Sequence, residues 1–189
     1  MSRRAERGAS GGDTLAGVRT LVSDPPPAEF AALLERRRRL GLDRRDEVWK
    51  GVLHMNPAPR GRHGDVLQQV AELLGPPARQ AGLFPLVADF NLGDPDDYRI
   101  PDGGLRHERR DLTYYPSAAL VVEILSPDDE TPEKIPFYAE HQVDELLIVD
   151  PTKRTVDWLA LEQGEYRAVE RSRLIDLGPA QLAEQIDWP

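Results

Sequence analysis

The chain of 189 residues contains no cysteine and no long apolar run. The first absence excludes disulfides, thiolate zinc sites and cysteine nucleophiles, and it fits a reducing compartment. The second excludes a membrane span, which needs about 20 consecutive apolar residues. The first twelve residues are rich in Arg, Ser and Gly and lack the apolar segment of a secretory signal. We therefore expect a cytoplasmic protein with no membrane segment.

Charge is distributed unevenly along the chain, whose formal net charge is −9. Residues 1–50 hold 11 Lys or Arg and 8 Asp or Glu, a balance of +3, so the remaining residues carry 13 against 25, a balance of −12. An acidic body argues against nonspecific coating of nucleic acid, which usually needs a basic patch. It leaves room for a nuclease, because divalent metals neutralise phosphates locally and the basic N-terminal part could supply positioning contacts.

The length and a hydrophobic content of 40% suit one good core and therefore one domain. We expect a flexible basic arm over residues 1–23 and a single domain over residues 24–189.

Apolar spacing predicts most of the elements. Helices are predicted over 28–40, with Gly41 as its C-terminal cap, and over 63–74, stopping at 75–77 with a shorter helical piece to 82. The run of four arginines at 36–39 could meet phosphates, although a solvated helix end that favours the dipole is the better interpretation. Residues 47–55 indicate either two short strands around a tight turn or one bulged strand.

The second half of the chain reads mostly as strands. Residues 84–92 and 98–102 predict a hairpin through the turn at 93–97, and 103–116 reads as irregular. Residues 119–126 predict a central strand. A helix follows from Pro132 to His141, which Pro136 should distort or shorten, then a strand at 145–150 and a hairpin formed by 154–161 and 165–170. The expected fold is α/β, with a central mixed sheet flanked by helices.

Glu123 stands alone among apolar residues in the predicted central strand. A buried carboxylate costs several kcal/mol or more unless a cation, a donor or a metal compensates it. Asp102 comes from a neighbouring strand candidate, and two such carboxylates suit Mg²⁺, which takes one or two of them together with water and phosphate oxygens. Taken alone, Asp102 before two glycines is ordinary turn chemistry, and Glu123 is equally well explained by a salt bridge.

Lys134 follows Glu123 by eleven residues at the start of the next predicted helix. From there it could point back over the strand end, to orient or deprotonate an attacking water or to hold transition-state charge. An isolated helix lysine is by default exposed to solvent, so the constellation rather than the residue supports this role.

Several motifs in this order resemble the Uma-type family of putative restriction endonucleases, within the PD-(D/E)XK nuclease superfamily. The matching segments are 47–51, His63 at its helix start, Pro101-Asp102, 120–127, Lys134 with Tyr138-Ala139, and 144–151, so the resemblance covers roughly residues 28–170.

The resemblance implies a restriction-endonuclease-like core and a set of site residues. Asp102 and Glu123 would hold Mg²⁺ or Mn²⁺, with the carbonyl of Ile124 as a third ligand. The superfamily lysine usually lies two residues after the glutamate, where this chain has Leu125, and Lys134 would replace it. Glu47 would complete the acidic set, with His63 nearby. For these last two, a surface glutamate and a helix-start histidine are at least as good an explanation.

The leading hypothesis is a Mg²⁺- or Mn²⁺-dependent endodeoxyribonuclease that hydrolyses DNA with a metal-activated water, Glu47 acting as a supplementary ligand or base. By analogy with enzymes that cut both strands, a homodimer would suit it. The alternative is a catalytically degenerate nuclease fold that binds DNA or protein. Its support is the acidic body and two departures from the family pattern: Glu130 with two prolines around Lys134, and two glycines after Asp102. A plain scaffold with a structural Glu123 is the third hypothesis.

Overall fold

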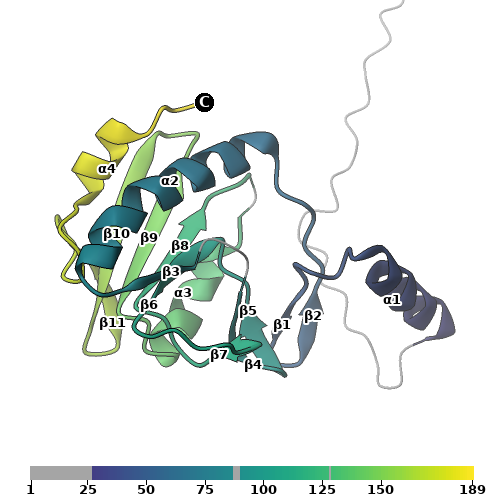
Figure 1. Cartoon of the computed structure of the whole chain (residues 1–189). Coiled ribbons are helices and arrows are strands. Elements are labelled where there is room, and N and C mark those ends of the chain that lie inside the picture. The colour runs from purple at the N-terminus through teal and green to yellow at the C-terminus, as the bar shows by residue number, and fades with distance from the viewer. Residues whose placement is uncertain (1–26, 87–89, 128) are drawn as a thin grey trace, which may run out of the picture.

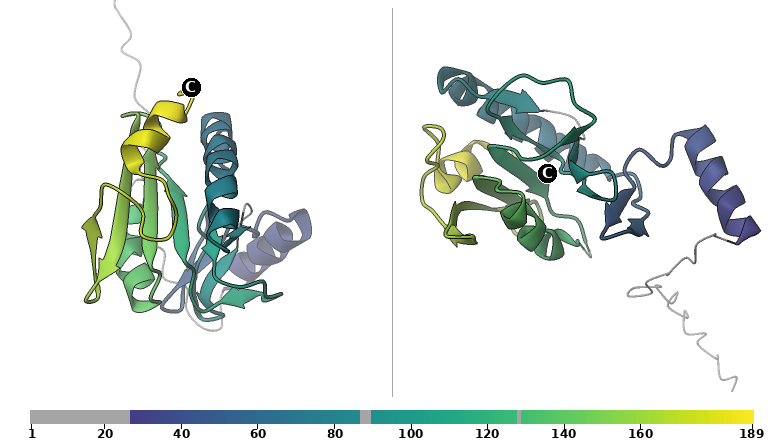
Figure 2. Two further views of the ribbon diagram at one scale, coloured as in Figure 1. Left: turned by 60° about the vertical axis from the view of Figure 1, so that its left-hand side comes forward. Right: turned by 90° about the horizontal axis from the view of Figure 1, so that it is seen from below.

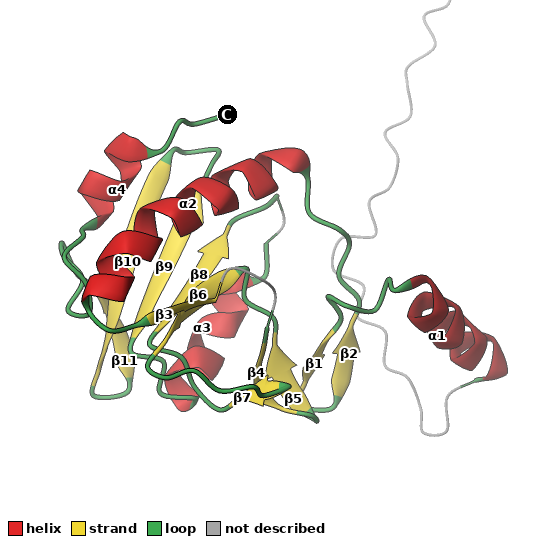
Figure 3. Ribbon diagram, viewed as in Figure 1, coloured by secondary structure: helices red, strands yellow, loops and turns green. Residues whose placement is uncertain are grey.

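The computed structural model describes residues 27–86, 90–127 and 129–189. The predicted arm over residues 1–23 lies outside the described residues. Four helices and eleven strands occur in the described part of the chain (Figures 1 and 3): α1 Ala28–Leu40, β1 Glu47–Trp49, β2 Val52–His54, α2 Gly61–Gln80, β3 Phe84–Leu86, β4 Asn91–Asp94, β5 Asp97–Arg99, β6 Gly103–Arg106, β7 Tyr114–Tyr115, β8 Leu120–Ile124, α3 Thr131–Glu140, β9 Glu145–Asp150, β10 Thr155–Glu162, β11 Glu165–Ala168 and α4 Pro179–Gln185.

The strands form two mixed sheets rather than the single sheet predicted. The larger has the order β11-β10-β9-β8-β6-β3, and the smaller has the order β2-β1-β5-β4-β7. Each contains one parallel pair, β8 with β9 in the larger and β4 with β7 in the smaller. The predicted mixed α/β class is confirmed.

Strand β8 lies inside the larger sheet, as predicted, and all five of its residues are buried. Because side chains alternate along a strand, its two faces enter two different cores. Leu120, Val122 and Ile124 join the core that contains residues of α2 and α4. Val121 joins the other core, which contains Phe137 and Tyr138 of α3. Glu123 lies two residues after Val121, so its side chain is on the same face of the strand and points to the α3 side.

The segment 47–55 is a hairpin, so of the two structures predicted for it, two short strands around a tight turn is correct and one bulged strand is not. Glu47 pairs with His54 and Trp49 with Val52, and the turn uses positive φ at Lys50 (50°) and Gly51 (79°). Since β1 also pairs with β5, Glu47 is placed beside the chain that leads from β5 to Asp102.

Helix α1 has the predicted bounds and ends at Gly41, which takes a left-handed conformation (φ 65°). It contains no buried residue. Figures 1 and 2 show it standing apart from the two sheets. Helix α3 lies close to its predicted bounds, but it continues past Pro136 to Glu140, so this proline does not shorten it.

Helix α2 continues through Pro76 and Pro77 to Gln80 as one element, instead of stopping at 75–77 before a separate shorter helical piece. Ala78, beyond both prolines, is fully buried in the same core as Val66, Val70 and Leu74. The packed face is thus continuous across the prolines, and its burial outweighs their poor helix propensity.

The prediction for residues 84–116 was wrong in two respects. Residues 84–86 pair with β6 in the larger sheet, so the hairpin in this region is β4 with β5 alone. Residues 103–116, expected to be irregular, contain two strands, β6 between β3 and β8 and the short β7. A Cβ on Gly104 would lie 2.4 Å from the carbonyl oxygen of Leu120, so this glycine permits close strand approach rather than marking a turn.

The C-terminal strands β9, β10 and β11 confirm the predicted strand and hairpin. Helix α4 was not predicted. Its buried Leu182 packs into the α2-side core.

Candidate active site

Glu123 is 5% exposed and faces two side chains from α3. Lys134 Nζ lies 3.5 Å from Glu123 Oε1, and the hydroxyl of Tyr138 donates a hydrogen bond to the same oxygen. Lys134 and Tyr138 are four residues apart, so one face of α3 presents both groups to the strand. Both contacts are made by Oε1 and fix the carboxyl group of Glu123.

Burial and charge shift the pKa values of these three groups. Burial raises the pKa of Glu123 to about 8, with Asp102 and Glu47 adding to the rise and Lys134 opposing it. Burial alone would lower the pKa of Lys134, but Glu123 and Glu47 outweigh it and raise that pKa above its ordinary value. Burial, followed by the charge of Glu123, raises the pKa of Tyr138. Lys134 is therefore an ammonium at neutral pH and Tyr138 a neutral donor.

Glu47 is 1% exposed and accepts three hydrogen bonds. Its Oε1 accepts from Lys134 Nζ (2.9 Å) and from the Ile100 amide (2.8 Å), and its Oε2 accepts from Trp49 Nε1 (2.7 Å). With both oxygens engaged, Glu47 is arranged to orient Lys134.

Arg99 packs against the ring of Trp49. Its guanidinium carbon lies 4.4 Å from the ring centroid of Trp49 and 4.0 Å from that of Phe137. Its Nη1 donates to the carbonyl of Val48 (3.0 Å). The indole that orients Glu47 is thus itself fixed by a buried cation between two rings.

Asp102 directly precedes β6 and is 8% exposed. Its Oδ2 accepts a hydrogen bond from the backbone amide of Ile124 (2.8 Å), which follows Glu123 in β8. Its Oδ1 lies 2.9 Å from His63 Nε2 at the start of α2, and His63 Nδ1 lies 3.4 Å from Ser126 Oγ. The Ile124 contact ties Asp102 to the strand that carries Glu123.

The donor set around these two carboxylates suits a hard divalent cation. Asp102 and Glu123 are oxygen ligands, and their charges interact strongly enough for Asp102 to raise the pKa of Glu123. Within residues 27–86, 90–127 and 129–189, no three His, Asp or Glu side chains converge as an all-protein metal cage. Mg²⁺ does not require one, since it usually keeps several waters beside one or two carboxylates.

The sequence-predicted residues come together from both sheets. Lys134 contacts Glu47 and Glu123, and the Ile124 amide joins Asp102 to the strand of Glu123. His63 contacts Asp102. Ile124 contacts Asp102 through its N–H, whereas its carbonyl was the group expected to act as a ligand. The two departures from the family pattern do not interrupt the strand or the helix. Strand β6 continues through the two glycines after Asp102, and α3 carries Lys134 to the site despite its prolines.

Tyr138 and Trp49 were not assigned roles from the sequence, although both contact the site. A signal for Tyr138 was present, because it lies one helical turn after Lys134. For Trp49 the signal was weaker. Residues two apart on a strand share a face, which places Trp49 beside Glu47.

Comparison with known proteins gives a consistent family and fold. A family model described as "Uma2: Putative restriction endonuclease" matches residues 27–185. The fold is similar to the crystal structure of "a putative nuclease belonging to DUF820" from Anabaena variabilis, with a TM-score of 0.60 at 18% identity over 74% of this chain and 90% of that one. No curated protein matches. No helix of the described residues is long and apolar enough to cross a membrane.

Proposed function

Because the chain belongs to the Uma2 family of restriction-endonuclease relatives, we propose that it is a metal-dependent endonuclease that hydrolyses DNA phosphodiester bonds. The observation that carries the proposal is the buried network in which two carboxylates, Asp102 and Glu123, lie with a permanently charged Lys134. Buried acids beside a cation are typical of sites whose chemistry needs displaced pKa values.

Asp102 and Glu123 would hold Mg²⁺ or Mn²⁺, and the carbonyl of Ile124 stays a candidate third ligand. A bound cation of this kind supplies an activated water and charge stabilisation on the phosphate. Because that chemistry provides the nucleophile, no serine, cysteine or histidine nucleophile is needed.

Lys134 would stabilise the negative charge that develops on the phosphate. Its pKa is raised, so it is a poor proton acceptor at neutral pH, and of its expected roles charge stabilisation is favoured over deprotonation of water. Glu47 would position this ammonium group through the 2.9 Å contact with its Nζ. We favour this role over those of supplementary ligand or base, because both oxygens of Glu47 already accept hydrogen bonds from protein donors.

His63 would position Asp102 rather than react. Its Nε2 contacts one oxygen of Asp102 while the Ile124 amide contacts the other, so the carboxyl plane is fixed from two sides. Neighbours that orient a metal ligand in this way commonly affect metal affinity.

The test is nicking of supercoiled plasmid with Mn²⁺ or Mg²⁺ by the wild type, Glu123→Ala and Lys134→Ala. We expect each variant to lose roughly a hundredfold or more in rate, the typical loss when an electrostatic catalytic group is removed. Glu165→Ala and Lys153→Ala are matched controls on exposed side chains and should cleave normally. Nicking that persists in both site variants would refute the assignment.

A catalytically degenerate nuclease fold is the second candidate, favoured by the contacts that both oxygens of Asp102 already make. It predicts DNA binding without a metal site. Calorimetry with Mn²⁺ separates the two, since only the nuclease proposal requires heat of binding in the wild type that Asp102→Ala abolishes. A homodimer that places two sites on a duplex is part of the nuclease proposal and is tested by the mass of the protein in solution.

A further inference from the structure

Residues 36–45, which we name the arginine segment, concentrate positive charge on an otherwise acidic protein. They include six arginines and one acidic residue, Asp43, whereas residues 51–189 carry a balance of −12. The segment comprises the last turn of α1 and the turns that lead into β1. A net charge of +5 in ten residues is far more than a helix end needs to satisfy its dipole.

One arginine of the segment, Arg37, anchors it next to the site. Arg37 makes two hydrogen bonds to the carboxylate of Asp46, which directly precedes Glu47, and it also donates to the carbonyl of Leu42. The hydroxyl of Tyr98 donates to the carbonyl of Asp46. Arg45 Nη1 lies 4.0 Å from Asp102 Oδ1, at the proposed metal site.

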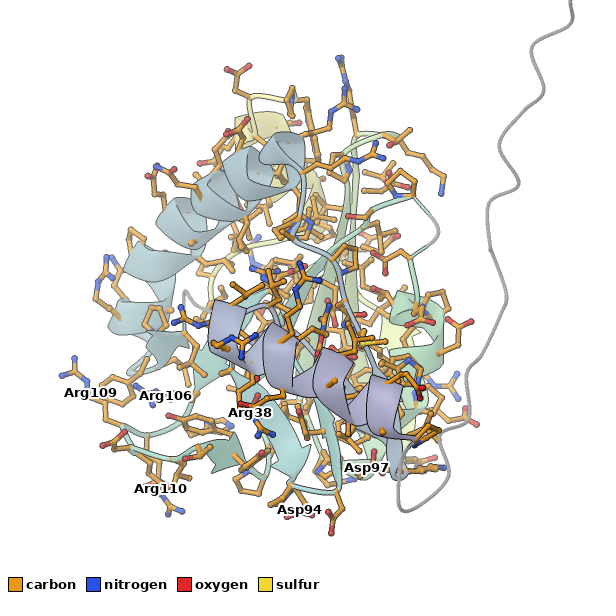
Figure 4. All side chains as sticks on the ribbon, turned by 90° about the vertical axis from the view of Figure 1, so that its right-hand side faces the viewer. Arg38, Asp94, Asp97, Arg106, Arg109 and Arg110 are labelled. Carbon is orange, nitrogen blue, oxygen red and sulfur yellow. The ribbon has the colours of Figure 1, made fainter. Side chains whose placement is uncertain are left out.

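The remaining helix arginines face solvent. Arg36, Arg38 and Arg39 are exposed, and Arg38 pairs with Glu35 at 3.6 Å, with side chains 74% and 63% exposed. Such an exposed pair contributes little. Figure 4, viewed from the side on which α1 lies, shows Arg38 extending from the helix in front of the sheets.

A second group of arginines lies at 106–110, where Arg109 has its guanidinium carbon 4.9 Å from the ring centroid of Phe84 and Arg106 and Arg110 contact groups of their own loop. Arg106 Nη1 donates to the carbonyl of Arg110 and to the hydroxyl of Tyr115, and Arg110 pairs with Glu108 at 2.6 Å. Figure 4 shows this group on another part of the surface.

We propose that the arginine segment binds the phosphate backbone of duplex DNA next to the catalytic site. The inference rests on the proposed function and gives the substrate its docking surface. Charge complementarity favours DNA as the ligand of this surface. The exposed arginines attract a polyanion, whereas the neighbouring carboxylates of the site would by themselves repel it. Leu33, Leu40 and Leu42 are also exposed, which makes a second copy the competing occupant. A twofold contact through this surface is disfavoured, because it would bring two positively charged arginine segments together.

The test is the salt dependence of binding to a fluorescent 20-base-pair duplex, measured by anisotropy in EDTA so that no cleavage occurs. Each phosphate contact contributes about 0.9 to the slope of log affinity against log salt. The triple variant Arg36→Gln, Arg38→Gln, Arg39→Gln should therefore bind more weakly, with a slope smaller by about two to three. Unchanged Mn²⁺ binding and circular dichroism show that the site and fold are intact.

The control removes the same charge elsewhere. Arg167, Arg171 and Arg173 lie on and after β11, at the far edge of the larger sheet, and each is more than half exposed. Replacing all three by Gln should leave the slope at the wild-type value.

An equal slope in the helix variant and the wild type overturns the inference and leaves the nuclease proposal standing. So does an equal loss in both triple variants, which would reflect net charge alone. A slope that does not change while the helix variant alters sedimentation mass assigns the segment to a second copy. If the wild type itself fails to bind the duplex, the docking surface and the DNA substrate are both refuted.

Discussion

At the scale of single residues, Glu123 is the group on which the proposed chemistry depends. Its pKa is raised to about 8 by burial, so the metal-free protein holds it largely protonated at neutral pH. A cation binds the carboxylate form and must displace this proton. We expect the apparent Mn²⁺ affinity to rise about tenfold per pH unit below pH 8 and to level off above it, as measured by calorimetry.

The control for this pH dependence is Glu123→Gln, which has no proton to release at that position. It should bind Mn²⁺ weakly with little change between pH 6 and pH 8. A wild-type affinity that is equally flat over this range would contradict the prediction, because it would mean that Glu123 is either already ionised or not a ligand.

Tyr138 allows a second prediction at this scale. Its hydroxyl donates to Oε1 of Glu123 and is fully buried, so Tyr138→Phe removes one positioning contact while keeping the ring in the core. Loss of a partner that orients a ligand typically costs 10- to 100-fold in metal affinity, and we expect a loss of about that size in Mn²⁺ titrations.

Tyr166→Phe is the matched control, since the hydroxyl of Tyr166 donates to the backbone carbonyl of Val143 (2.7 Å) rather than to a site residue. Its Mn²⁺ affinity should match the wild type. Equal affinities in both phenylalanine variants would show that Glu123 keeps its orientation without Tyr138.

At the scale of elements, the packing of β6 against β8 determines where Asp102 lies. Gly104 of β6 has no room for a side chain, because a Cβ there would lie 2.4 Å from the carbonyl oxygen of Leu120. We expect Gly104→Ala to lower the free energy of unfolding by about 1–3 kcal/mol, the usual cost of overpacking, as measured by urea denaturation.

Gly64 provides the opposite case for the same substitution. It lies within α2, and a Cβ there would meet no atom within 4 Å. Gly64→Ala should therefore stabilise the protein by about 0.5–1 kcal/mol through helix propensity. If both alanine variants shift stability in the same direction, the close contact between β6 and β8 does not explain Gly104.

The elements also show what the sequence could predict. Local signals located α1, β8, α3 and the β10–β11 hairpin, because periodicity and turn residues act over a few positions. They failed for the continuity of α2 through Pro76 and Pro77 and for β6. In both cases packing against residues far away in the sequence overrides local propensity. Ala78 of α2 is buried in the core, and Gly104 of β6 packs against Leu120 of β8.

At the scale of the whole molecule, the site joins parts of the chain that sequence order separates. Glu47 comes from the smaller sheet, Glu123 from the larger one and Lys134 from α3. The resemblance of motifs identified these residues, but it could not show that Glu47 accepts a hydrogen bond from Lys134, since the pair is 87 residues apart. Such a contact depends on how the two sheets pack.

This arrangement predicts that metal binding stabilises the entire fold. A ligand that binds only the folded state adds about 2.7 kcal/mol at a hundred times its dissociation constant. For a chain of this size that corresponds to an increase in Tm of roughly 5–10 °C. Scanning fluorimetry should show this rise with Mn²⁺ in the wild type and in Glu165→Ala, whose side chain is exposed. Asp102→Ala should show no rise, because it lacks the proposed ligand that links β6 to β8. An equal rise in Asp102→Ala would place the bound metal elsewhere on this acidic protein.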